Sequence, residues 1–112
     1  MKKIIITLVI IGFVSTAIAG KTYTPSQLNQ MIRSGHYPAQ GEATSQSKPM
    51  SFNACKRVAR NIMSQIRTSY PVKTIVDTSA LYMVKAWAND GIIIVSCSEP
   101  DKKMVITQAP YK

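Results

Sequence analysis

The two cysteines of the sequence, Cys55 and Cys97, restrict the fold more than any other feature. Cys55 lies in a segment with helical apolar spacing, and Cys97 lies in a run of β-branched residues. An even cysteine count without C-x-x-C spacing is typical of one structural disulfide in an exported protein; a redox pair or two free thiols are the alternatives. Closing a loop of about 43 residues would stabilise the fold by about 4 kcal/mol on the chain-entropy account. We therefore expect a bond that ties a helix to a strand.

The beginning of the sequence has the pattern of an export signal. Two lysines precede an apolar run over residues 4–14, and small residues with an A-x-A cleavage pattern follow. As a helix this run rises only about 16 Å, which is short of the roughly 30 Å hydrocarbon core of a membrane; an uncleaved anchor is the alternative. We predict a signal peptide over residues 1–19, cleavage near Ala19–Gly20, and a periplasmic or secreted protein.

Composition indicates one small, basic, folded domain. The chain has 112 residues, of which 46% are hydrophobic, which is typical neither of a disordered polar chain nor of a polytopic membrane protein. Removing residues 1–19, with two of the 14 Lys and Arg residues, leaves 12 cations against 5 acids and a net charge of +7. Such a charge favours phosphate-rich or acidic partners, and a plain solubility role is the alternative.

The first structured segment after the leader has the signals of a short helix. Thr24 can cap it, Pro25 suits the first helical position, and Gln27 completes a capping box. Gly35 supplies a left-handed end, so we expect a helix over Pro25–Ser34, packed loosely on the core or serving as a mobile arm.

The stretch that follows is rich in turn-forming residues. From His36 to Pro49 it reads HYPAQGEATSQSKP, which predicts a linker or long flexible loop. Ordered packing of Tyr37 is the alternative. Residues 20–50 are thus predicted to form a short helix and a flexible loop.

The clearest amphipathic helix of the sequence begins after Ser51, a candidate cap. Its apolar stripe comprises Phe52, Cys55, Val58, Ala59, Ile62, Met63 and Ile66. The opposite side has no acid, although solvated helix faces usually mix signs. Its cations form a candidate basic face: Lys56, Arg57, Arg60 and Arg67.

Four runs of β-branched and aromatic residues follow this helix and predict strands. They are Val72–Val76, Leu81–Ala88, Ile92–Cys97 and Met104–Thr107. Asn89-Asp90-Gly91 is a strong hairpin signal. Residues 51–112 are therefore predicted to form a disulfide-stapled α+β domain: a four-stranded antiparallel meander with one long amphipathic helix packed on one face, preceded by the short N-terminal helix.

Alternation along the strands divides the sheet into two faces. We expect Tyr82, Val84, Ala86, Ala88, Ile93, Val95 and Cys97 to face the helix. The other face is too apolar for simple exposure to water, and exposed apolar patches usually mark partner surfaces. Three explanations are open: the first helix folds back over this face, the protein forms a homodimer through it, or a different protein binds there. The candidate partner-binding residues are Trp87, Met83, Ile92 and Ile94.

The sequence has no constellation that specifies a reaction. His36 is the only histidine, so paired cysteines leave too few ligands for a metal, and a cysteine in a disulfide is no nucleophile. Most acids fall at strand ends or in turns, and phosphate-binding glycine loops and G-x-S-x-G are missing. We expect no enzymatic activity, no metal and no cofactor; a small hydrolase is the catalytic alternative.

The partner class follows from the basic face. No aromatic residue is interleaved with its cations in the sequence, which disfavours nucleic acid because base stacking needs aromatic rings. Contact with a protein or with an anionic membrane surface fits better.

Four segments of the chain resemble the small exported KikA-type proteins encoded beside type IV secretion genes on conjugative plasmids. These segments are NQMIRSGHYPAQG, ACKRVARNI, KAWANDGIIIVSC and KKMVITQAPY. The resemblance covers most of the chain after residue 19 and carries no functional residue over. It implies an accessory role in the donor cell envelope, with a killing phenotype in some recipients that accompanies transfer. We expect a noncatalytic exported accessory protein that contacts an envelope or secretion-system protein. A small basic toxic effector acting on anionic membranes, or a small hydrolase, is the alternative.

Overall fold

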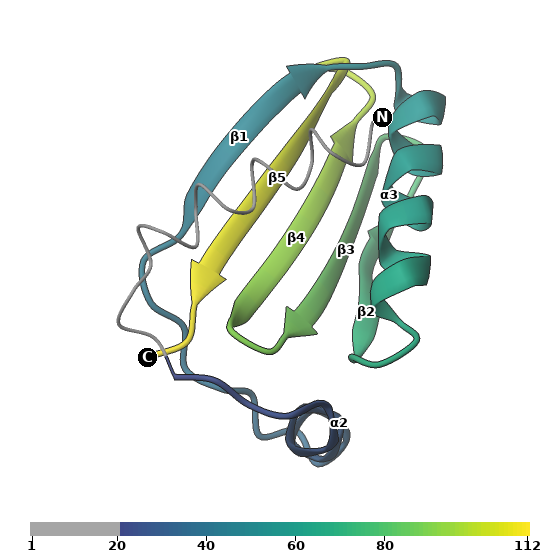
Figure 1. Ribbon diagram of the computed structural model, residues 1–112. Coiled ribbons are helices and arrows are strands. Elements are labelled where there is room, and N and C mark those ends of the chain that lie inside the picture. Colours follow the sequence, from purple (N-terminus) through teal and green to yellow (C-terminus); the bar gives the residue numbers. More distant parts are fainter. Residues whose placement is uncertain (1–20) are drawn as a thin grey trace.

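The protein is an α+β structure with a five-stranded antiparallel sheet and two helices (Figure 1). The computed structural model describes residues 21–112. The predicted signal peptide over residues 1–19 and its cleavage site lie outside the described residues. In chain order the elements are α2 (Pro25–Arg33), β1 (Thr44–Pro49), α3 (Phe52–Ile66), β2 (Val72–Asp77), β3 (Leu81–Ala88), β4 (Gly91–Ser98) and β5 (Lys103–Pro110). Helix α3 runs alongside β3 and β2, and α2 lies near the lower end of the sheet (Figure 1).

The strands are arranged in the order β1-β5-β4-β3-β2. Strands β2 to β5 are joined consecutively, which confirms the predicted antiparallel meander and its α+β class. Ala88 pairs with Gly91, so Asn89 and Asp90 form a two-residue hairpin loop. An added Cβ at Gly91 would lie only 2.3 Å from the carbonyl oxygen of Ala109, which explains why this position holds a glycine.

The fifth strand, β1, corrects the sequence prediction. The stretch from His36 to Pro49 was expected to be a linker or flexible loop, yet Thr44–Pro49 pairs with β5 along its whole length. All six residues of β1 are exposed, so the strand has no buried face to produce an alternating pattern. Backbone pairing and a 2.8 Å hydrogen bond between the hydroxyls of Ser45 and Thr107 hold it, and the sheet has five strands instead of four.

Helix α3 packs on one face of the sheet and forms the main core. Its N-cap is Ser51, whose hydroxyl accepts a hydrogen bond from the Ala54 amide. The predicted sidedness is confirmed, because Tyr82 pairs with Cys97 and both are buried against the helix. The buried residues of this core are Phe52, Cys55, Ala59, Met63, Tyr82, Val84, Ala86, Val95, Cys97 and Met104.

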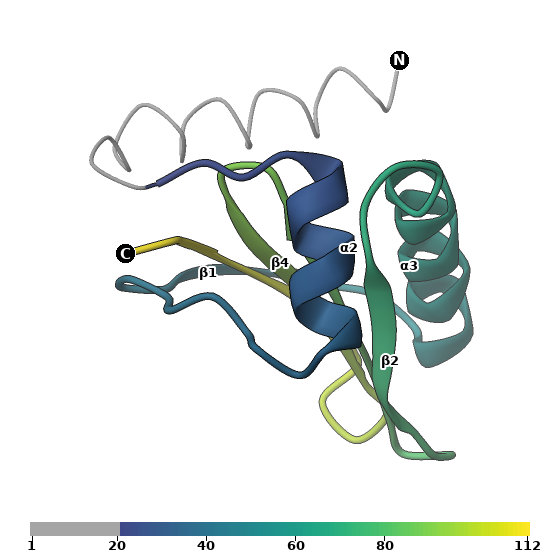
Figure 2. The same ribbon diagram turned by 90° about the horizontal axis from the view of Figure 1, so that it is seen from below.

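Helix α2 packs on the other side of the sheet, so that α2 and α3 lie on opposite sides of it (Figure 2). The predicted capping box of Thr24 and Gln27 is present, and Gly35 adopts the expected positive φ of 79° after the helix ends at Arg33. A second apolar cluster forms beneath α2, with Leu28, Trp87, Ile92, Ala109 and Tyr111 as its buried members. Neither described helix is long and apolar enough to cross a membrane.

Candidate functional site

Cys55 and Cys97 form the predicted disulfide and join α3 to β4. Both side chains are fully buried, and their Cα atoms lie 5.7 Å apart, within the usual range for such a bond. A buried structural disulfide indicates an oxidising compartment, extracellular or periplasmic. The bond fixes the solvent-facing side of α3 relative to the sheet.

The predicted partner-binding face is largely covered. Trp87 and Ile92 are each only 2% exposed, because α2 folds back over them, while Met83 and Ile94 are half-buried. Of the three explanations for this apolar face, the structure thus shows the first. Trp87 and Ile92 are core residues here, and the expectation that they present an open contact surface is corrected.

Tyr37 extends this cover beyond α2. Its ring stacks on the Trp87 ring, with the two centroids 5.7 Å apart and an interplanar angle of 25°. The segment that carries it is held by backbone hydrogen bonds from Gly41 to Pro110 and from Lys112 to Ala39, of 2.7 and 2.9 Å. The alternative of ordered Tyr37 packing is therefore confirmed.

Two lysines lie beside this aromatic pair on the same sheet face. Lys73 of β2 and Lys85 of β3 are direct cross-strand partners. The Lys85 ammonium lies 4.9 Å from the Trp87 ring centroid and donates a 2.9 Å hydrogen bond to Oε1 of Gln40. Burial lowers the pKa of Lys85. This cluster was not predicted from the sequence, because the Asn89-Asp90 turn fixes the register of β3 on β4 and leaves that of β2 on β3 open.

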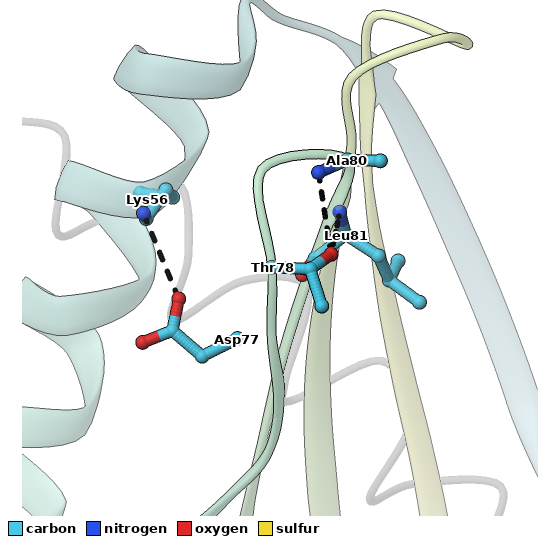
Figure 3. Close-up of polar contacts among 5 residues, drawn as sticks. All are labelled: Lys56, Asp77, Thr78, Ala80 and Leu81. Atoms are coloured by element: carbon cyan, nitrogen blue, oxygen red, sulfur yellow. Dashed lines mark hydrogen bonds and ion pairs between the residues drawn. The ribbon is translucent and has the colours of Figure 1, made fainter.

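The predicted basic face lies on the exposed side of α3. Arg57, Arg60 and Arg67 are exposed, and none of them makes an ion pair within residues 21–112. Lys56 is partly covered and lies 3.8 Å from a carboxylate oxygen of Asp77, at the end of β2 (Figure 3). In the adjoining turn, the Thr78 hydroxyl accepts hydrogen bonds from the Ala80 and Leu81 amides (Figure 3).

Aromatic rings do lie beside two of these cations, contrary to expectation. The ammonium of Lys56 is 5.4 Å from the ring centroid of Tyr82, and the guanidinium of Arg60 is 5.5 Å from it. Lys56 also lies 5.3 Å from the Phe52 ring. Tyr82 belongs to β3, so sequence spacing within α3 could not show the contact. Both rings are buried, and the cations cover them as part of the core boundary.

Two acidic side chains make local contacts around the turn between β4 and β5. A carboxylate oxygen of Asp101 accepts a 3.0 Å hydrogen bond from Ser98, and Glu99 pairs with Lys102 at 2.6 Å. Within residues 21–112, no three His, Cys, Asp and Glu side chains are grouped in a way that could hold a metal ion. No protein-family model, curated protein or solved structure matches the chain. Within the described residues, the two groups of cations, on α3 and beside Trp87, are the features from which we infer a function.

Proposed function

We propose that this chain is a noncatalytic exported accessory protein that binds an acidic protein of the cell envelope or of a secretion system. The binding surface is the basic face of α3, formed by Lys56, Arg57, Arg60 and Arg67. The resemblance to KikA-type proteins supports a link to plasmid conjugation or to a conjugation-linked killing phenotype. A signal peptide cleaved near Ala19–Gly20 would deliver the protein to the periplasm or beyond.

The observation that carries this proposal is the unbalanced charge of α3. Arg57 and Arg60 are three residues apart and so are neighbours on the helix surface, and no acid of the helix compensates them. Like charges at such spacing destabilise a helix by about 0.2–0.5 kcal/mol per pair. An acidic partner would remove this repulsion and would also be attracted from a distance.

The disulfide supports the same surface. Because Cys55 belongs to α3, its bond to Cys97 holds the helix in one orientation on the sheet. A rigid surface loses less conformational entropy on binding than a mobile one. The cationic side chains are thus displayed on a fixed support.

The membrane-active alternative has less support. A protein that disrupts a bilayer inserts apolar side chains among the lipid chains, in addition to binding the head groups. Within residues 21–112, the large hydrophobic residues that are exposed are Tyr37 and Ile75. The apolar stripe of α3 is packed against the sheet and cannot be inserted while the fold is intact.

Charge reversal tests the proposal. Arg57→Glu, Arg60→Glu and Arg67→Glu together should abolish crosslinking of the protein to its periplasmic partner, identified by mass spectrometry. A control of equal charge reverses three exposed lysines away from α3, at positions 48, 103 and 112, and should retain the crosslink. Equal loss in both variants, or retention in the α3 variant, would contradict the proposed surface.

The same proteins distinguish the membrane-active alternative from the proposed protein-binding function. Under the proposal, the purified protein releases no dye from anionic vesicles. Leakage at low salt that disappears at high salt would instead favour the toxic effector.

A further inference from the structure

We propose that Lys73 and Lys85, together with Tyr37 and Gln40, form a binding site for a doubly charged phosphate group. The site lies on the sheet face that α2 covers, and it is independent of the basic face of α3. Its first support is the strand register. Lys73 and Lys85 lie directly opposite each other on β2 and β3, an arrangement that is destabilising for like charges.

Both ammonium groups are held toward the same segment. Lys73 Nζ lies 3.4 Å from the Tyr37 hydroxyl, and Lys85 Nζ lies 2.9 Å from Gln40 Oε1. The aromatic rings add a second attraction, because Lys73 is 5.9 Å from the Tyr37 centroid and Lys85 is 4.9 Å from that of Trp87. Neutral side chains of residues 37–40 thus contact both cations.

A counter-charge is missing from this cluster. Neither lysine makes an ion pair with an acid in the part of the chain that the structure describes. Burial makes this costly for Lys85, whose pKa is lowered by desolvation. An anion between the two lysines would reduce their repulsion and stabilise the charged form of Lys85.

The available hydrogen-bond donors define the class of anion. Each ammonium has further N–H donors, and the Tyr37 hydroxyl can donate one proton. Gln40 directs its carbonyl oxygen to Lys85, which leaves its amide group to donate. A cluster of donors with two positive charges matches a phosphate dianion, whereas a single carboxylate would neutralise only one of the lysines.

Trp87 provides a direct measurement, because it is the only tryptophan and touches Lys85. Inorganic phosphate is added to the purified protein at constant ionic strength, with sodium chloride as the reference salt. We expect a saturable change in Trp87 fluorescence and a rise in Tm with phosphate alone. Unchanged fluorescence and Tm would overturn the proposal.

Matched variants locate the site. Lys73→Met and Lys85→Met remove one charge each and keep the alkyl stem, and each should weaken phosphate binding about tenfold or more. Lys73 is exposed, so its replacement leaves the core intact if Lys85→Met does not fold. Arg57→Gln with Arg60→Gln removes two charges from α3 and should retain full phosphate binding. An equal response from Lys73→Met and the unmodified protein, or loss of binding in the α3 variant, would overturn the site.

The source of the phosphate is tested separately. Phosphatidylcholine vesicles with and without phosphatidic acid are added in place of inorganic phosphate. A Trp87 response that requires phosphatidic acid and is lost in Lys73→Met identifies a lipid head group as a ligand. A response to inorganic phosphate alone identifies free phosphate, and both results support the site.

Discussion

The rings of Tyr37 and Trp87 are stacked 5.7 Å apart, although Trp87 is 2% exposed and Tyr37 is 52% exposed. Tyr37 therefore lies between the indole ring and the solvent. Tyr37, which lies in the connection between α2 and β1, thus covers a part of the apolar sheet face that α2 leaves uncovered.

Replacing Tyr37 should expose Trp87 to water. Tyr37→Ala removes the stacked ring, so the Trp87 emission should shift to longer wavelength and the free energy of unfolding should fall by about 1–2 kcal/mol. Fluorescence and urea denaturation measure the two effects. Tyr37→Phe is the control, because it keeps the stack and should leave the emission unchanged. An identical emission spectrum in Tyr37→Ala would show that the ring does not shield the indole.

Loss of the disulfide should cost a large part of the stability. Cys55→Ala with Cys97→Ala leaves the fold without its crosslink, and we expect urea denaturation to show a loss of about 2–4 kcal/mol. A reducing agent should destabilise the unmodified protein and leave the double variant unaffected. Two alkylatable thiols in the folded, untreated protein would contradict the bond itself.

Two glycines should respond differently to an added methyl group. Gly91→Ala places a Cβ too close to the Ala109 carbonyl oxygen, so a backbone atom of β5 must move, which should cost about 1–3 kcal/mol. Gly35→Ala meets nothing within 4 Å and should cost about 1 kcal/mol through its positive φ of 79°. Thermal unfolding of both variants tests this order. A Gly91→Ala protein as stable as the unmodified one would contradict the close approach of β4 and β5.

Tyr111 should make the fold sensitive to alkaline pH. Burial first, and then the negative charge of Asp90, raise its pKa well above the ordinary 10.0, and its hydroxyl donates a 2.6 Å hydrogen bond to the Ala88 carbonyl. The folded state thus keeps the proton, whereas the unfolded state loses it above pH 10.0. This contribution to stability is complete below pH 10.0 and is lost as the pH rises above it, by up to about 1.4 kcal/mol per pH unit.

Urea denaturation across this pH range, with Tyr111→Phe as the matched variant, measures the effect. The variant should be less stable at neutral pH, because the Ala88 carbonyl loses its donor, and its stability should fall less steeply above pH 10.0. Lys85 acts with the opposite sign, since its lowered pKa is a cost that disappears as the pH rises toward 10.5. It is present in both proteins, so the difference between them isolates Tyr111. Equal slopes would contradict the raised pKa.

Elements with a buried face could be predicted from the sequence. The stripe of α3 records burial directly, because one side of the helix packs and the other does not. The alternation of β3 and β4 separates the residues that contact α3 from those that lie beneath α2. The hairpin loop at Asn89 then fixed which residues of β3 and β4 share a face. The strand β1 could not be found in this way, because Thr44–Pro49 is exposed at every position and its sequence, TSQSKP, has no apolar residue.

Some contacts of the candidate surfaces could likewise be predicted from the sequence, and others could not. The basic face of α3 was predictable, because helical spacing places Arg57 and Arg60 together on one side. The stacking of Tyr37 on Trp87 and the cation–π contact of Arg60 with Tyr82 were not predictable, since each contact joins elements whose relative position only the tertiary structure defines. The net charge of the chain does not indicate which neutral groups surround its cations.

The position of β1 at the edge of the sheet has a consequence for the order of folding. Its partner is β5, and the hydroxyls of Ser45 and Thr107 meet although the two residues are 62 positions apart in the sequence. The backbone groups of β1 that bond to β5 therefore stay hydrated until β5 is available, whereas the β2–β3 and β3–β4 hairpins can close locally beforehand. The first strand in the sequence is consequently expected to be the last to join the sheet.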